Sequence, residues 1–313
     1  MRVLGIDAGA TKTECLLANE KGQILSKARG PGGNFQLYDE EEVEFVLDDL
    51  TTRALAGYRG PVDALCVGMA GAGRERDYRA MQRILRRLRR ARRNLVTNDA
   101  LIALVAGTGE RYGVVLIVGT GATAYGINRK GETARAGGWG HLLGDEGGGY
   151  WMGLRALQAI VRAHDGRAKA TSLKQSVLAR LGIDDTESLV HRVYREFARE
   201  EIAALAPLVQ TAADLGDAAA QAIIDDATRE FMRSVESVIG KLELAGQSFR
   251  LVLSGGLWKA VPVLRQDFEK FAKKIAPWVN VHLLDAEPAR GAVHLAVELA
   301  SSESEEAATL LNR

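Results

Sequence analysis

The sequence predicts an α/β fold of two similar domains, each with a mixed βββαβα sheet that carries helices on both faces. Short apolar runs alternate with stretches of helical periodicity along the 313 residues, which is typical of α/β proteins. Residues 2–28 and 113–134 also share one order of strand, glycine-rich turn, strand, turn and strand. A chain of this length can bury two separate cores. We therefore expect a duplicated fold with a cleft between its halves.

The first domain is expected to span residues 1–110, because the shared pattern starts again after a junction near 107–113. Strands are expected at short apolar runs, and helices where apolar residues follow helical spacing. The expected elements are strands at 2–7, 13–18 and 21–28, a loop at 30–34, a helix at 39–56, a strand at 63–71, a helix at 75–93, a strand at 94–99 and a helix at 100–109.

The second domain is expected to span residues 111–288 and to contain a helical insertion. Its expected elements are three strands within 113–134, long helices between about 151 and 246, and strands at 249–256 and 279–285. A closing helix at about 289–301 is expected to pack back on the first domain, and a polar tail follows it.

Composition excludes several classes of protein. Apolar residues make up 47% and charged residues 26% of the chain, and the net charge is +1, so we expect neither a nucleic-acid nor a membrane partner. No apolar run approaches the roughly 20 residues that span a bilayer, and no secretory signal opens the chain. Cys15 and Cys66 lie in apolar runs and are expected to be buried thiols. A cytoplasmic protein is the expectation.

Residues 74–93 contain ten arginines. On a helix, Tyr78, Met81, Ile84, Leu85 and Leu88 would form an inner stripe and leave the arginines outside. A nucleic-acid-binding patch is one interpretation of this segment. The near-neutral net charge favours the other interpretation, a solvated face.

The turn in GIDAGATKT (5–13) has the composition of a phosphate loop, and three kinds compete. A Walker A loop needs a different spacing of Gly and Lys, and both it and the dinucleotide-binding loop lead into a helix, whereas a strand follows here. The third kind is a hairpin turn whose successive N–H groups form an anion-binding cavity, which glycine lets a phosphate approach.

A second turn, GTGAT (119–123), supports this interpretation, because Gly9-Ala10-Thr11 matches Gly121-Ala122-Thr123. Thr13 and Thr123 can add hydroxyl donors, and Lys12 either adds charge or faces solvent. The predicted phosphate-binding residues are Gly9, Ala10, Thr11, Lys12, Gly119, Thr120, Gly121 and Ala122. Asp7, at the mouth of the first turn, suits an indirect Mg²⁺ ligand acting through water, because Mg²⁺ prefers oxygen ligands and keeps several waters.

The segments GIDAGATKT, VTND and VLIVGTGATAYG together resemble the phosphate-one, connect and phosphate-two segments of the sugar kinase/actin/heat-shock ATPase superfamily. Within it, GGWGHLLGDEGGGYWMG (137–153) resembles the N-acetylglucosamine kinase branch of the BadF/BadG/BcrA/BcrD ATPase family. The resemblance runs from Val3 to about Leu295. It implies two actin-like (ribonuclease H-like) domains with ATP bound in the cleft between them.

The activity implied by the resemblance is transfer of a phosphoryl group from ATP, with Mg²⁺, to the 6-hydroxyl of an amino sugar. N-acetylglucosamine is the first expectation, while glucosamine, N-acetylmuramic acid and a nucleotide switch without sugar transfer stay open. A homodimer is also implied. The family includes reductase activators with an iron–sulfur cluster between subunits, but Cys15 and Cys66 are not near Gly121 or residues 137–153, which disfavours that activity.

The resemblance identifies Asp99, the last residue of NLVTND, as the general base that accepts the proton of the sugar hydroxyl. The alternative role for Asp99 is the N-cap of the following helix. Asn98 is expected to orient Asp99 or to bind the substrate.

The resemblance also implies a sugar pocket. Its predicted residues are Gly138, Trp139, Gly140 and Asp145, with Asn34 from the first domain. Core packing is the alternative for Trp139, and a turn position is the alternative for Asn34. His141 invites a zinc hypothesis, which we reject because no cysteine lies near it in sequence.

The segment RLVLSGGLWKAVPVL is predicted to receive the nucleoside. Gly255 and Gly256 follow a buried strand and would allow close approach of the base or ribose, with Trp258 and Lys259 flanking the adenosine. The alternative is an ordinary tight turn between a strand and a helix.

Overall fold

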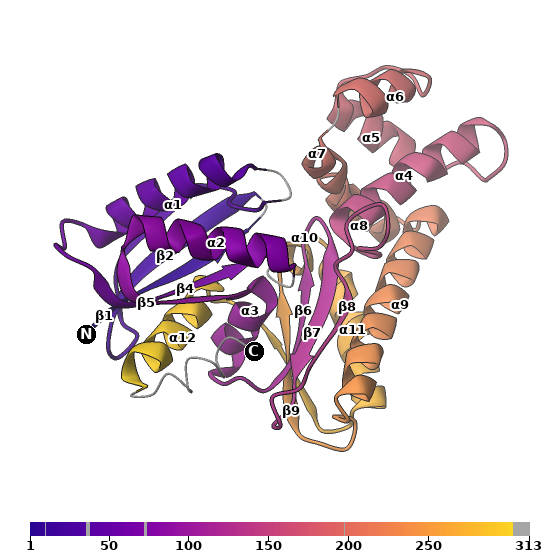
Figure 1. Ribbon diagram of the computed structural model, residues 1–313. Coiled ribbons are helices and arrows are strands. Elements are labelled where there is room, and N and C mark those ends of the chain that lie inside the picture. The colour runs from indigo at the N-terminus through magenta and orange to yellow at the C-terminus, as the bar shows by residue number, and fades with distance from the viewer. Residues whose placement is uncertain (10, 36–37, 72–73, 197, 303–313) are drawn as a thin grey trace. The chain divides into compact units, whose positions relative to one another are not determined.

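The computed structural model describes residues 1–9, 11–35, 38–71, 74–196 and 198–302. The chain forms two compact units (Figure 1). Unit 1 contains Met1–Val115 and the chain from His282 onward, and unit 2 contains Leu116–Val281.

Unit 1 is built on a five-stranded mixed sheet with the order β3-β2-β1-β4-β5. The hairpin strands pair antiparallel, whereas β1 pairs parallel with β4 and β4 parallel with β5. The strands are β1 (Arg2–Ala8), β2 (Lys12–Asn19), β3 (Ile24–Pro31), β4 (Val62–Met69) and β5 (Ala91–Asn98). The helices are α1 (Glu40–Leu55), α2 (Glu75–Leu88), α3 (Asp99–Thr108) and α12 (Ala289–Ser301).

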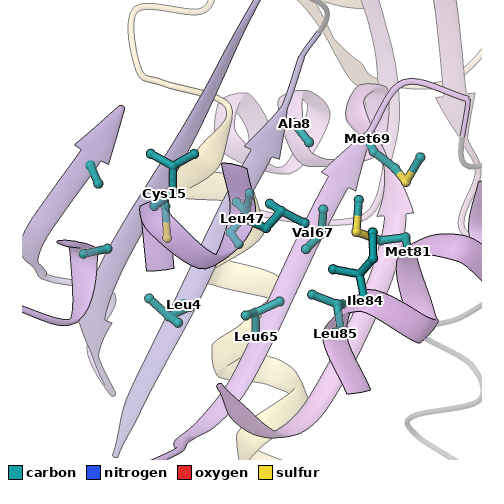
Figure 2. Packing of buried hydrophobic residues seen from close by; sticks show 14 of the residues in the cluster. Leu4, Ala8, Cys15, Leu47, Leu65, Val67, Met69, Met81, Ile84 and Leu85 are labelled. Carbon is teal, nitrogen blue, oxygen red and sulfur yellow. The ribbon is translucent and has the colours of Figure 1, made fainter. Parts of the chain in front are cut away.

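Helices cover both faces of this sheet (Figure 1). One face packs against α1 and α2 through a buried apolar cluster that includes Leu4, Leu47, Val67 and Met81 (Figure 2). The other face carries α3 and α12, and the glycines of β1 and β4 let these helices approach closely. A Cβ on Gly5 would lie 2.4 Å from the Val293 nitrogen, and one on Gly68 would lie 2.3 Å from the Ile102 side chain.

Unit 2 is organised around a second five-stranded sheet, with the order β10-β9-β6-β7-β8. Its strands are β6 (Gly113–Val118), β7 (Ala122–Ile127), β8 (Thr133–Gly137), β9 (Phe249–Ser254) and β10 (Val279–Leu283). The helices are α4 (Gly149–His164), α5 (Leu173–Leu181), α6 (Ser188–His191), the π-helix η1 (Arg192–Glu196), α7 (Arg199–Ala203), α8 (Ala206–Asp214), α9 (Ala218–Lys241), α10 (Leu257–Ala260) and α11 (Pro262–Ile275). The long helix α9 packs on β7 and β8.

The α/β fold class with two mixed sheets is confirmed, but the predicted helix at 75–93 is too long. Helix α2 ends at Leu88, because Arg89 adopts a left-handed conformation with φ of 50° and β5 begins at Ala91. The predicted inner stripe is correct at Met81, Ile84 and Leu85, which are buried.

The arginines of the 74–93 segment therefore divide between a helix and a strand, and several bind groups of unit 1. Arg83 and Arg87 form ion pairs with Glu40 of α1. Arg93, on the edge strand β5, donates to the carbonyl oxygens of Leu299 and Ser302. Among the helices of the described ranges, none has both the length and the apolar character required to cross a membrane.

The packing of α12 on α3 predicts the effect of one substitution. A Cβ on Gly291 would lie 1.9 Å from the Ile102 carbonyl oxygen, so Gly291→Ala should lower the free energy of unfolding by about 1–3 kcal/mol. The control is Gly240→Ala in α9, where nothing lies within 4 Å of the added methyl group, and it should not destabilise the protein. Urea unfolding measures both, and equal stability of the two variants would contradict the packing.

Candidate active site

The first glycine-rich turn joins β1 to β2 and is held by backbone hydrogen bonds. The Gly9 N–H donates to the Lys12 carbonyl at 3.0 Å, and the Gly9 carbonyl accepts from the Gly33 N–H at 3.1 Å. Thr11 and Lys12 are exposed on the outer edge of the turn. Ala10, also predicted to bind phosphate, lies outside the described residues. The turn is thus tied to the loop that leaves β3.

Thr13 and Asn34 are buried residues that follow this turn and the loop tied to it. Thr13 is fully buried, its hydroxyl has no hydrogen-bond partner among the described residues, and a Cβ on Gly33 would lie 2.9 Å from that hydroxyl. Asn34 follows directly and is only 5% exposed, and its carbonyl accepts from the Tyr38 N–H at 3.1 Å. A buried hydroxyl without a partner is costly, so Thr13 is suited to gain a hydrogen bond when a ligand binds.

Two carboxylates meet at the carboxyl edge of the unit 1 sheet. Asp7 is in register with Gly68 of β4, which is in register with Thr97 of β5. Asp99 comes two residues after Thr97, as the first residue of α3. Two strand spacings put the backbones of β1 and β5 about 10 Å apart, and the side chains can reach across the glycine between them.

The electrostatics agree with this placement. The pKa of Asp7 is raised to about 7, first by burial and then by the carboxylates of Asp99 and Glu14, while the Lys12 ammonium lowers it. A nearby cation would stabilise the Asp7 carboxylate, because a positive charge offsets the cost of burying a negative one.

The structure shows that the alternative role of Asp99, the N-cap of α3, is wrong. Strand β5 ends at Asn98, one residue earlier than predicted, and Asn98 rather than Asp99 is the N-cap. The Asn98 Oδ1 accepts from the Leu101 N–H at 2.6 Å, and the Asp99 Oδ1 accepts from the Ala100 N–H at 3.0 Å. Asn98 therefore sets where the helix begins, and with it the position of the Asp99 carboxylate.

Glu14 is a residue that sequence reasoning missed. It pairs in register with Asp7 across the hairpin, is 2% exposed, and accepts a 2.5 Å hydrogen bond from the Arg29 Nε. Arg29 also pairs with Glu287, just before α12. The available signal was a single acidic residue in the apolar run TECLLA (13–18).

The second turn joins β6 to β7 in unit 2 and is anchored on helix α4. The Gly119 and Thr120 carbonyls accept from the N–H groups of Gly149 and Tyr150 at 2.8 and 2.9 Å. The Gly119 N–H donates to the Gly121 carbonyl at 2.9 Å, so it is engaged within the turn. These bonds satisfy two N–H groups at the start of α4 that lack partners within the helix.

The glycines before α4 make this anchoring possible, and sequence reasoning did not assign them a role. A Cβ on Gly148 would lie 2.7 Å from the Gly121 carbonyl carbon, and one on Gly149 would lie 3.1 Å from the Gly119 oxygen. The run GGG before a helix was the available signal.

Three predicted sugar residues lie around the second turn. The Gly138 N–H donates to the Ala122 carbonyl at 3.0 Å, and Gly138 and Gly140 have positive φ. Asp145 also has a positive φ, of 60°, and its carboxylate lies against Gly121, where a Cβ would be 2.4 Å from Oδ2. The Gly140 N–H donates to the Asp145 Oδ1 at 3.4 Å, and burial raises the pKa of Asp145.

Trp139 and Trp258 occupy opposite environments. Trp139 is 63% exposed, so the core-packing alternative for it is wrong. Trp258 is 2% exposed, its Nε1 donates to the Ser254 carbonyl at 3.0 Å, and its ring packs between Phe231 and Phe268. Trp258 is therefore a core residue, which corrects its predicted role in nucleotide binding.

Gly255 and Gly256 lie at the exposed junction of β9 and α10. Gly255 has a φ of 102°, and a Cβ there would lie 2.2 Å from the Val118 carbonyl oxygen, so the tight strand-to-helix turn itself requires this glycine. A role of the two residues in nucleotide binding stays a prediction.

Asp7 and Asp99 suit a partly hydrated Mg²⁺ ion better than a direct protein cage. Within the described ranges, no three His, Cys, Asp or Glu side chains are grouped to hold a metal ion. Mg²⁺ is commonly bound through one or two carboxylates with several waters and substrate phosphates, and these two residues supply such carboxylates.

The chain belongs to the BadF/BadG/BcrA/BcrD ATPase family, whose family model matches residues 4–296. It is 34% identical to the N-acetylmuramic acid/N-acetylglucosamine kinase of Clostridium acetobutylicum, over 94% of this chain and 97% of that protein. It is 31% identical to the N-acetyl-D-glucosamine kinase of Dictyostelium discoideum, again over 94% and 97%.

Solved structures share the fold. One from Chromobacterium violaceum has a TM-score of 0.76 at 24% identity and covers 95% of this chain and 98% of its own. A ROK family glucokinase from Streptomyces griseus has a TM-score of 0.60 at 17% identity, over 95% and 98%. The two-domain fold class of the sugar kinases is thereby confirmed.

The raised pKa of Asp7 predicts a pH-dependent effect on stability in metal-free protein. A carboxyl group with a folded pKa of about 7 stabilises the fold below its unfolded pKa, and this contribution is lost as pH rises to 7. The difference in the free energy of unfolding between Asp7→Asn and the wild type should therefore shift by roughly 1–3 kcal/mol in favour of the variant between pH 5 and pH 8. Urea unfolding in EDTA measures it.

The control for this experiment is Asp49→Asn, because Asp49 is an exposed carboxylate on α1 that pairs with Arg53. Asp49→Asn should change the free energy of unfolding by the same amount at pH 5 and at pH 8. A pH-independent effect of Asp7→Asn would contradict the raised pKa of Asp7.

The contact between Gly148 and the second turn predicts a loss of nucleotide affinity. In Gly148→Ala the added methyl group would lie within 2.9 Å of the turn backbone, so the turn must shift and ATP-analogue binding should weaken roughly 10-fold or more. Calorimetry measures the Kd. The control is Gly246→Ala, where nothing lies within 4 Å, and an equal Kd in both variants would refute a role for this turn.

Proposed function

We propose that the protein is an ATP-dependent kinase that phosphorylates the 6-hydroxyl of an amino sugar, with N-acetylglucosamine as the first candidate. The observation that carries this proposal is the pair Asp7 and Asp99 at the end of parallel strands, beside a Gly–Thr hairpin turn. Family membership and the two related kinases support it. Glucosamine and N-acetylmuramic acid are the alternative substrates.

The proposal assigns the phosphates of ATP to the two turns. Gly9, Thr11 and Lys12 would bind them from unit 1, and Thr120 and Gly121 from unit 2. The exposed hydroxyl and ammonium groups of Thr11 and Lys12 suit phosphate oxygens. The proposal places the nucleoside against Gly255 and Gly256.

Asp99 is proposed as the general base. It would accept the proton of the 6-hydroxyl while that oxygen attacks the γ-phosphate, and the ADP oxygen leaves on the opposite side. The Ala100 N–H donates to one oxygen of the Asp99 carboxylate, which orients the group. The start of α3 also stabilises a negative charge at this position.

A Mg²⁺ ion is part of the proposal and would be held through water by Asp7, close to Asp99. When bound, it supplies positive charge to the phosphate oxygens. The same charge would keep Asp7 ionised and would remove the repulsion between the two carboxylates.

The sugar is assigned to Asn34 of unit 1 and to Gly138, Trp139, Gly140 and Asp145 of unit 2. Asp145 can accept hydrogen bonds from ring hydroxyls, and the exposed Trp139 ring offers an apolar surface to the sugar face. A homodimer belongs to the same proposal on the ground of the sequence resemblance, and a cytoplasmic location belongs to it on the ground of the composition and the buried thiols of Cys15 and Cys66.

The cysteines argue against the reductase-activator activity of other family members. Cys15 and Cys66 are both fully buried in the sheet of unit 1. Burial raises the pKa of Cys15 to about 12 and that of Cys66 further still. An iron–sulfur cluster needs thiolates that can reach it, and these two groups are withdrawn from the surface.

The test is Asp99→Asn in an assay of ADP release with a panel of amino sugars, plain hexoses and no sugar. Turnover with the sugar should fall by about 100- to 10,000-fold, while the Kd of an ATP analogue should change little. NMR of the product should show the phosphate on the 6-oxygen.

The matched control is Asp77→Asn, which removes a carboxylate from the first turn of another helix in the same unit. It should retain wild-type turnover. ADP release that is equally fast without sugar would indicate a plain ATPase and not a sugar kinase. Unchanged turnover of Asp99→Asn would exclude Asp99 as the general base.

A further inference from the structure

The loop that follows β8 exposes unusual apolar surface. Trp139 is 63% exposed, and Leu142 and Leu143 are 82% and 80% exposed. Three large apolar side chains within five residues therefore face solvent. Exposed apolar groups gathered beside a polar site commonly mark a surface that contacts a ligand.

Arg135 completes this surface with a positive charge. It is exposed on the edge strand β8, and its guanidinium carbon lies 4.9 Å from the centre of the Trp139 ring. A Cβ on Gly144 would lie 3.0 Å from the Trp139 Cβ, so the base of the indole is packed while its ring projects. Within the described ranges, no acidic group forms an ion pair with Arg135. Stacking orients the guanidinium plane and leaves its N–H edges available.

The Arg135–Trp139 pair lies beside the residues already assigned to the sugar. Gly137 pairs in register with Thr123 at the end of the second turn. Gly144 contacts Trp139, and the next residue, Asp145, lies against Gly121. The loop also contains Glu146, so a negatively charged sugar approaching it would meet two acidic side chains and would require a cation.

We propose that Arg135, stacked on Trp139, binds a carboxylate that the amino sugar carries on a short apolar arm, as N-acetylmuramic acid does on its lactyl ether. This subsite rests on the proposed function, because it selects among the substrates of that reaction. The guanidinium would bind both carboxylate oxygens in a bidentate pair. The Trp139 ring and the neighbouring leucines would contact the apolar arm. An uncharged amino sugar would bind without using Arg135.

The test compares kcat/KM for N-acetylmuramic acid and for N-acetylglucosamine in the wild type and in Arg135→Gln. Loss of the charge-assisted pair should lower kcat/KM for the acidic sugar by about 10- to 100-fold. The value for N-acetylglucosamine should stay within about 2-fold of the wild type. Arg135→Lys should restore part of the loss, because it keeps the charge without the bidentate geometry.

Two controls isolate the charge. Arg155→Gln breaks a second arginine–tryptophan pair, in which Arg155 lies 4.9 Å from the Trp151 ring on α4. It should leave kcat/KM unchanged for both sugars. The methyl ester of N-acetylmuramic acid keeps the arm but not the charge, so its kcat/KM should not respond to Arg135→Gln.

Several outcomes would overturn the subsite. They are an equal loss for both sugars in Arg135→Gln, no loss for either, and a wild-type enzyme that phosphorylates N-acetylglucosamine but neither phosphorylates nor binds the acidic sugar. The last result leaves the proposed function intact. If no sugar is phosphorylated, the proposed function fails, and calorimetric binding of N-acetylmuramic acid to the wild type and to Arg135→Gln decides the subsite alone.

Discussion

One backbone hydrogen bond in each unit ties the glycine-rich turn to the loop that leaves the third strand. In unit 1 it runs from the Gly33 N–H to the Gly9 carbonyl, and in unit 2 from the Gly138 N–H to the Ala122 carbonyl. Each loop carries a candidate sugar residue directly after that glycine, Asn34 in one unit and Trp139 in the other. In both units a backbone hydrogen bond therefore links a candidate phosphate turn to a candidate sugar loop, although the accepting residues, Gly9 and Ala122, are not matched positions of the two turns.

Asp7 and Glu14 of unit 1 are acidic residues at positions where the burial of a charge opposes folding. Asp7 and Glu14 are paired across the hairpin, and of these two carboxylates Glu14 alone forms an ion pair with another described residue, at 2.5 Å from Arg29. Burying a carboxylate without a partner opposes folding. Such a cost is commonly retained at sites that bind a cation or react, so the asymmetry between Asp7 and Glu14 supports the role proposed for Asp7.

Much of the fold and part of the candidate site could be predicted from the sequence. Apolar runs located the strands, and the repeated turn located both halves. The end of α2 was missed because arginines continue on both sides of Arg89, so the sequence carries no sign of its left-handed conformation. Glu14 was missed because its partner Arg29 is far along the chain. The N-cap role of Asn98 was missed because strand ends are set by pairing with β4.

The sequence alone determined the local features of this protein: the alternation of strands and helices, the two matched turns, and the residue types gathered at them. These follow from periodicity and backbone conformation within a few residues. Only the tertiary structure decided that Trp139 is exposed beside Arg135 while Trp258 packs between Phe231 and Phe268. Both tryptophans are near glycines in similar local sequence, and burial depends on side chains that distant segments bring against them.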